Sequence, residues 1–397
     1  MNTYLMTTGL AIFSMLFGAG NLIYPLLVGI SSGRLTWLGM IGFLLTGALL
    51  PLCGLVTMIL YDGNYNAFFG RLGKIAGQFT IFACMMIIGP VVAIPRIASL
   101  SQVMIAPFLP FIQDSNVINS FIFSVIFLGV TFLMTYRESK IIQVLGNFIS
   151  PALLVSLFII IIRGLITADS IVPATNDTFT IFFSNFLRGY ETLDLIGAIF
   201  FASIIISLLK QQSHGAVSLK KLCTMGLKAG IIGTALLCIV YIGMSSLSMW
   251  HGHDLTTLSA GSLFREISFR ILGQHGAIII AMAVLMACLS TSIALSAVVA
   301  EYIQHTVCYN RISYTNALLL TVILSLPLST FGLEKVLELT GGPIVYIGYP
   351  IIIALTLCNL AYKLVGFTPV KIPVLLTGLA SFGWYFKDYF IDYITIL

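Results

Sequence analysis

Acidic and hydroxyl side chains occur inside one strongly apolar segment, GYETLDLIGAIFF at residues 189–201. Asp194 lies within this run, close to Thr192 and Gly197. A carboxylate inside a bilayer is costly, so it should face a bundle interior, pair, or serve an ion or substrate path. Alternatively, Asp194 caps a helix that begins there, which still requires a break in the segment. Glu191 is nearer the polar loop and is expected at the membrane interface.

A second unusual stretch, GAGNLIYP at residues 18–25, interrupts another apolar run. Its glycines permit non-helical backbone, while Pro25 removes a donor and disfavours helix at Tyr24. In lipid, an interruption survives only where it is buried or lines a cavity. The amides freed there suit a carboxylate, and the carbonyls suit a cation. A kink that lets a neighbouring helix approach closely is the alternative explanation.

Adjacent hydroxyls occur in a third apolar run, ACLSTSIAL at residues 287–295. Ser290 and Thr291 stand beside the small residues Ala287 and Ala294. Hydroxyl and carbonyl oxygens are preferred by hard cations over sulfur or imidazole. Membrane Ser and Thr also bond back to a carbonyl one turn earlier, so ion ligation and a purely internal bond both stay open.

The elements that carry these residues follow from composition. The chain has 397 residues, of which 59% are hydrophobic and 8% charged, unlike a soluble globular domain. A helical span needs about 20 apolar residues. We expect an all-α integral membrane protein with spans near 4–30, 35–61, 75–105, 116–136, 141–167, 189–209, 221–249, 276–305, 314–333, 336–362 and 372–395. The last run is interrupted by Lys387, Asp388 and Asp392, so it is one span or a span followed by an interfacial helix.

The longest loops are expected at residues 168–188 and 250–275, which leaves no room for a separate catalytic or nucleotide-binding domain. The first run is too long for a signal peptide, and no Lys or Arg precedes Arg34. Lys and Arg are more frequent in the loops on the N-terminal side, which predicts a cytoplasmic N-terminus. The net charge of +5 comes from scattered residues and does not favour nucleic acid as a partner.

Cysteine and histidine do not indicate a metal site. The seven cysteines lie mostly inside spans and show no CxxC spacing, as expected for small core residues. His251 and His253 form a pair in the outer loop that could hold a metal. Because no third ligand is evident, a solvated loop is the preferred interpretation.

The interruptions at residues 18–25 and 189–201 lie five spans apart. Two inverted five-helix repeats produce this pattern, with the binding site between their discontinuous first helices. We expect one transporter domain over residues 1–397, with repeats at 4–167 and 189–362 and accessory spans at 363–397. An intramembrane enzyme would need paired catalytic groups, and the sequence has no HExxH or GxSxG motif. A membrane receptor or scaffold would not need two broken helices.

Several stretches resemble the bacterial branched-chain amino acid:cation symporters (the LIVCS family), which belong with the LeuT-type five-plus-five transporters. The matching stretches are GAGNLIYPLLVG at 18–29, IGPVVAIPRIAS at 88–99, GNFISPAL at 146–153, GYETLDLIGAIFF at 189–201 and ACLSTSIALSAVVAEY at 287–302. Their order is the same as in the family, and they cover about three quarters of the chain from span 1 to span 8. The resemblance implies a LeuT-type fold of about 11–12 membrane helices in the bacterial cytoplasmic membrane.

The resemblance also implies residue roles. A sodium site would join the carbonyls of Ser14, Phe17 and Ala287 to the hydroxyls of Ser290 and Thr291. A second sodium site would use Asn21 and Thr192, but its further Asn has no counterpart in residues 221–249. A substrate-binding Tyr of span 3 is also missing from residues 75–105, so the amides of Ala19, Gly20 and Asn21 would hold the carboxylate. No other cofactor is implied.

The implied mechanism is alternating access, in which an amino acid binds between the two breaks with its ammonium at span 6 carbonyls or Asp194. Leu, Ile and Val should compete, because one methylene in an apolar pocket discriminates by only about 1–3 kcal/mol. In a proton-coupled permease of the same fold, Asp194 or Glu301 would carry the proton instead. The expected substrate site contains Gly18, Ala19, Gly20, Asn21, Ile23, Thr192, Asp194, Ile196, Gly197 and Ile199.

One further charge, Arg96, ends IGPVVAIPR in span 3 after Pro90 and Pro95. It could pair with an acidic residue as a gate, or its long side chain could reach the interface, which is the preferred interpretation. Glu301 is also expected at the interface. The sequence does not indicate an oligomeric state.

Overall fold

The computed structural model describes residues 2–109, 117–136, 150–168, 170–174, 176–212, 219–256, 258 and 260–387. Helices are the only regular elements in these ranges, and every predicted span contains helix. Residues 141–149 of the predicted fifth span and 388–395 of the last span lie outside the described residues, so the alternatives for the C-terminal run stay open.

The helices of the first half follow the predicted spans, with four short π-helical or 3-10 turns inserted. They are α1 (Asn2–Leu16), α2 (Ala19–Ser32), η1 (Gly33–Leu35), α3 (Thr36–Leu44), η2 (Leu45–Leu49), α4 (Leu50–Leu60), α5 (Tyr65–Gly70), α6 (Lys74–Met86), η3 (Ile87–Val91), α7 (Ala93–Ile105), η4 (Ala106–Phe108), α8 (Val117–Thr135) and α10 (Ser150–Ile166). Span 3 bends at Gly89, whose backbone is not helical.

The second half contains one very long helix and two spans made of several pieces. Its elements are α11 (Thr178–Arg188), η7 (Gly189–Thr192), α12 (Asp194–Gln212), α13 (Leu219–His251), α14 (Ala260–Tyr302), η8 (Ile303–Val307), α15 (Tyr314–Ser329), α16 (Leu333–Thr340), η9 (Ile344–Gly348), α17 (Tyr349–Val365) and α18 (Lys371–Tyr385). Within the described residues, seven continuous helical stretches are long and apolar enough to cross a membrane, and three shorter apolar helices accompany them.

Both predicted long loops are partly helical, which corrects the sequence interpretation. Helix α11 fills the second half of residues 168–188, where Asp177 caps its start by accepting a hydrogen bond from the Thr180 amide at 3.2 Å. Helix α14 begins at Ala260 and turns at Gly273, which has a φ of 67°. Polar and charged residues made these segments resemble loops, but their apolar faces pack against the bundle. Ile181 and Phe264 are fully buried.

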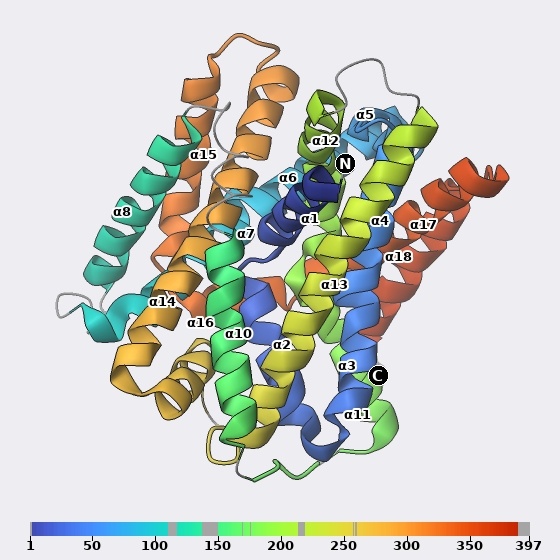
Figure 1. The fold of residues 1–397 in the computed structure, drawn as a ribbon. Helices are drawn as coiled ribbons and strands as arrows, with labels where there is room; N and C mark the ends of the chain where they lie inside the picture. The colour runs from blue at the N-terminus through green and yellow to red at the C-terminus, as the bar shows by residue number, and fades with distance from the viewer. Residues whose placement is uncertain are drawn as a thin grey trace, which may run out of the picture.

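The helices pack in pairs that match between the two halves of the chain. Helix α1 packs on α13 as α11 packs on α3, and α2 packs on α13 as α12 packs on α4. Figure 1 shows α1 and α2 beside α13 in the middle of the bundle, whereas α18 lies at its edge, where it packs on α17. This pairing supports the expected inverted repeats, although their boundaries remain a prediction.

The first and sixth spans are both discontinuous, as the sequence predicts. The first span breaks at Phe17 and Gly18, between α1 and α2. Pro25 does not contribute to this break, because it lies inside α2 and Tyr24 is helical. Membrane helices tolerate a proline where neighbouring groups satisfy the freed carbonyl. The sixth span breaks at Leu193, between η7 and α12.

Candidate functional site

At the break in the first span, a side chain of the same segment satisfies the free backbone amide. Gly18 is extended, with φ −112° and ψ −160°, and precedes the first residue of α2. Its amide donates to Asn21 Oδ1 at 2.9 Å. An Asn side chain can satisfy an amide that has no helical partner at a helix start.

The break in the sixth span depends on a left-handed residue. Leu193 has a φ of 64°, which is strained for a residue with a side chain. Beyond it, the Asp194 amide donates to Thr192 Oγ1 at 3.3 Å, and the Leu195 amide donates to the hydroxyl of Tyr349 at 3.0 Å. The predicted capping role of Asp194 is therefore not seen, because its side chain is used elsewhere.

A buried polar cluster joins the two breaks. Asn21 Nδ2 donates to both Asp194 Oδ2 and the Tyr241 hydroxyl, and Tyr241 in turn donates to Asp194 Oδ2 at 3.2 Å. All three side chains are at least 95% buried. Asp194 therefore accepts hydrogen bonds from two neutral groups, and the first and sixth spans meet through side chains rather than backbone.

Arg96 lies at this site and not at the membrane interface, which corrects the preferred sequence interpretation. Only 4% of its surface is exposed. Its Nη1 donates to the carbonyl of Glu191 at 2.7 Å, and its Nη2 donates to the carbonyl of Thr192 at 3.1 Å. A cation favours the carbonyl end of a helix, so Arg96 stabilises the end of η7. Glu191 is half-buried, and its carboxylate accepts from Tyr346 at 3.4 Å.

Five oxygens gather between α1 and α14. Ser290 Oγ lies 2.8 Å from the Ala287 carbonyl and 3.5 Å from that of Ser14. Thr291 Oγ1 lies 3.1 Å from the Phe17 carbonyl and 3.5 Å from that of Ser14. These are the groups that the family resemblance assigned to a sodium ion. Three carbonyls and two neutral hydroxyls, all buried, are a donor set suited to a hard monovalent cation.

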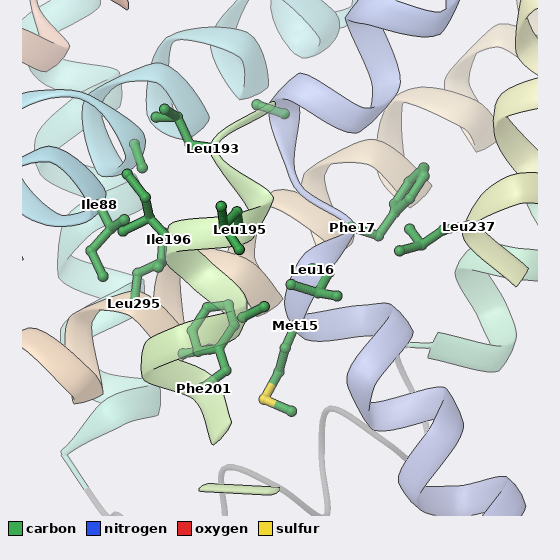
Figure 2. Close-up of a cluster of buried hydrophobic side chains, with 14 of the residues drawn as sticks. Met15, Leu16, Phe17, Ile88, Leu193, Leu195, Ile196, Phe201, Leu237 and Leu295 are labelled. Atoms are coloured by element: carbon green, nitrogen blue, oxygen red, sulfur yellow. The ribbon is translucent and has the colours of Figure 1, made fainter. Parts of the chain in front are cut away.

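A cavity of about 30 Å³ lies between the two breaks. Its polar lining comes from Gly18, Ala19, Asn21, Arg96, Thr192, Asp194 and Thr291, with Gly197 beside them. Its apolar lining comes from Met15, Leu16, Ile88, Ala93, Ile97, Leu193, Phe201 and Leu295. Figure 2 shows several of these apolar side chains gathered from α1, η3, α12 and α14 around the breaks.

Four predicted substrate residues do not line this cavity. On α12 the lining residues are Asp194, Gly197 and Phe201, which share one helical face and exclude Ile196 and Ile199. Ile196 is buried outside the cavity lining, and Ile199 faces Gly54 of α4.

The other two of these residues belong to α2. Ile23 is fully buried more than one turn from the break. Gly20 lies against Arg96, because a Cβ there would be 3.1 Å from Nη2. The structure thus brings together the cation-site residues and six of the ten substrate residues.

Arg96, Tyr241 and Tyr349 were not assigned to the site from the sequence. The sequence did signal Arg96 as a charge inside an apolar run, but no local pattern shows that carbonyls of the sixth span satisfy it. The two tyrosines carry no distinguishing pattern.

The histidines at residues 251 and 253 each contact another group of the chain. His251 contacts the carbonyl of Gly164 at 2.8 Å, and His253 pairs with Asp254 at 3.1 Å. Within the part of the chain that the structure describes, no three His, Cys, Asp or Glu side chains come together as metal ligands. The site that remains is the one between the two breaks.

Solved structures of the same architecture define the class of protein. The transporter Mhp1, from the nucleobase-cation-symport-1 family, matches with a TM-score of 0.58 over 97% of this chain and 93% of its own, at 15% identity. A Na⁺-coupled sialic acid symporter matches with a TM-score of 0.60 over 94% of this chain and 88% of its own, at 11% identity. The chain therefore has the LeuT-type membrane transporter fold.

Sequence relatives identify the family within that class. The branched-chain amino acid transport protein family matches residues 1–390, and the chain belongs to this family. The branched-chain amino acid permease BrnQ of Bacillus subtilis is 30% identical over 89% of this chain and 80% of its own length. A Staphylococcus aureus protein named as a branched-chain amino acid carrier is 31% identical over 96% of this chain and 88% of its own. The chain is a transport protein and not an enzyme.

Proposed function

We propose that this chain imports leucine, isoleucine and valine across the bacterial cytoplasmic membrane by symport with sodium, with its N-terminus in the cytoplasm. The observation that carries the proposal is the position of the five-oxygen cluster directly beside the break of the first span. Phe17 supplies one carbonyl to that cluster, and the next residue, Gly18, lines the cavity. A cation and a substrate would therefore bind next to the same two backbone residues, Phe17 and Gly18.

The proposed substrate position uses the charges and dipoles of the two breaks. The carboxylate would lie at the start of α2, where the helix dipole favours a negative charge. The ammonium would lie at Asp194. The aliphatic side chain would contact apolar lining residues such as Ile88, Phe201 and Leu295. The cavity must enlarge to hold an amino acid, which fits a carrier that alternates between conformations.

Transport by reconstituted protein tests this proposal. In proteoliposomes, an inward sodium gradient should drive accumulation of labelled leucine, and unlabelled isoleucine and valine should compete. Replacement of sodium by choline at fixed pH should abolish accumulation. Failure of the reconstituted protein to move leucine in counterflow would overturn the transport proposal.

A proton-coupled permease is the second candidate, because Asp194 is a buried carboxylate held only by neutral donors among the described residues. Glu301, half-buried at the end of α14, is the other acidic residue that the sequence suggested. Accumulation that survives in choline and follows a pH gradient would favour this candidate. Loss of that accumulation with leucine counterflow retained in Asp194→Asn, and retention of both in Glu301→Gln, would assign the proton to Asp194.

A further inference from the structure

The guanidinium of Arg96 has unused hydrogen-bonding capacity at the cavity. An arginine carries five N–H donors in a fixed fork. Nη1 and Nη2 each donate one bond to the carbonyls of Glu191 and Thr192. The Nε–H group is buried and has no hydrogen-bond partner among the described residues. A buried donor without a partner is uncommon and costly, so it needs an explanation.

Arg96 and Asp194 both line the same cavity, yet they do not pair with each other. Every ion pair found in the described ranges involves surface residues, such as Lys210 with Asp62. Arg96 is held by carbonyls, and Asp194 is held by an amide and a phenol. Two opposite buried charges are thus compensated by neutral groups, which for Arg96 include the ring of Tyr24 at 5.9 Å, and each lacks an ionic partner among the described residues.

The nearest other charged residues, Arg188 and Glu191, do not add a charge to the cavity wall. Arg188 donates to the Leu27 carbonyl, Ser31 and Asn185, all at 2.9 Å. The Glu191 carboxylate accepts from Tyr346. Neither Arg188 nor Glu191 lines the cavity. The cavity therefore carries one positive and one negative side chain on its wall.

We propose that Arg96 anchors the substrate carboxylate, so that Arg96 and Asp194 together select zwitterionic α-amino acids. The Nε–H and the second N–H of Nη2 form the side of the fork that can receive a carboxylate in a bidentate manner. The start of α2 lies close to Nη2, because a Cβ on Gly20 would be 3.1 Å from that atom. Arg96 would supply a carboxylate anchor in span 3, where residues 75–105 contain no tyrosine. This inference deepens the proposed function and rests on it.

A comparison of leucine with leucinol tests the role of Arg96. Leucinol keeps the ammonium and the side chain but has a hydroxymethyl group in place of the carboxylate. Affinities of purified protein for both compounds are measured by ligand-dependent thermal stabilisation. We expect wild type to prefer leucine by about 10- to 100-fold, the range of a hydrogen-bonded charged group. In Arg96→Gln the preference should fall to about twofold or less, mainly through weaker leucine binding.

Arg188→Gln is the matched control, since Arg188 is a half-buried arginine that donates to a backbone carbonyl but lies outside the cavity. It should keep the wild-type preference for leucine even if overall affinity falls. If Arg96 only holds η7 in place, Arg96→Gln should weaken the binding of leucine and of leucinol equally. An unchanged ratio of the two affinities in this variant would therefore overturn the inference. If Arg96→Gln does not fold, Arg96→Lys retains the positive charge at the carbonyls but not the fork, and the ratio should fall several-fold.

Failure of the proposed function gives a different result. If wild type binds another α-amino acid but not leucine, the branched-chain proposal fails, and that amino acid with its amino alcohol tests Arg96 in the same way. If wild type binds the amino alcohol as well as the amino acid, the inference about Arg96 fails while the transport proposal stands.

Discussion

The two helix breaks differ in what their freed carbonyls meet. At the break of the first span, the carbonyls of Ser14 and Phe17 meet the neutral hydroxyls of Ser290 and Thr291. At the break of the sixth span, the carbonyls of Glu191 and Thr192 are already held by the cationic side chain of Arg96. A resident cation leaves no place for a mobile one, so we expect a transported ion at the first break only.

The amide sides of the breaks differ as well. The first break is satisfied within its own segment, by Asn21. The second is connected to another helix, because the Leu195 amide donates to the hydroxyl of Tyr349 at the start of α17. We therefore expect the second break to be the more rigid of the two, and the first to respond to the ion.

The largest effect is expected from removing hydroxyls at the first break. Ser290→Ala combined with Thr291→Val should raise the sodium concentration for half-maximal leucine uptake by about 10- to 100-fold, because a hydrogen-bonding group to a charge contributes about 1.5–3 kcal/mol. The maximal rate should recover at high sodium. Uptake against a sodium series measures both quantities.

Two controls sharpen this prediction. Ser296→Ala removes another buried hydroxyl of α14, whose Oγ has no partner among the described residues, and it should leave sodium dependence unchanged. Thr192→Val alters the second break and should also leave the sodium dependence of uptake unchanged. A shift in Thr192→Val as large as in the double variant would place an ion at both breaks and contradict the comparison.

An intermediate effect is expected from adding one methyl group at each break. Gly18→Ala puts a Cβ 3.2 Å from Thr291 Cγ2, which displaces a residue of the five-oxygen cluster. This overpacking should weaken sodium binding by about 1–2 kcal/mol, which corresponds to a roughly 5- to 30-fold lower affinity. Gly197→Ala puts a Cβ 3.3 Å from the Phe201 ring, at the cavity wall. It should raise KM for leucine and leave the sodium dependence unchanged. A change of sodium dependence in Gly197→Ala and of leucine KM alone in Gly18→Ala would contradict the assignment of the ion to the first break.

The smallest effect is expected from the tie between the second break and α17. Tyr349→Phe keeps the stacking on Tyr190, at a centroid distance of 5.1 Å, but removes the acceptor of the Leu195 amide. It should lower the free energy of unfolding by about 1 kcal/mol with little change in sodium dependence. The control is Tyr190→Phe, because the Tyr190 hydroxyl has no hydrogen-bond partner among the described residues. Reversible unfolding in micelles measures the stability of both variants. Equal free energies of unfolding of the two variants would show that the hydrogen bond from the Leu195 amide to Tyr349 does not contribute to stability.

The membrane spans and the two interruptions could be predicted from the sequence, because apolar length and backbone breakers are local properties. The grouping of Ser290 and Thr291 with carbonyls of the first span also followed from the family resemblance, and the structure brings these groups together. Helix α11 was missed because its polar residues and short length resemble a loop. The apolar face that makes it helical is recognisable only against α3, on which it packs.

The position of Arg96 could not be predicted because its partners are backbone carbonyls of a distant segment. Carbonyls become available there only because Leu193 adopts a left-handed conformation, and a leucine gives no sequence signal for that. The exclusion of Ile196 and Ile199 from the cavity had a similar cause. Any face of α12 could have turned inward, and the choice depends on contacts with α4.

The cavity of about 30 Å³ has a consequence for the membrane itself. It has room for roughly two water molecules, far too few to form a continuous wire across the bilayer. An incoming amino acid must therefore push the walls apart to make its own room. Without bound substrate, the closed carrier therefore gives ions no continuous water-filled path through this cavity.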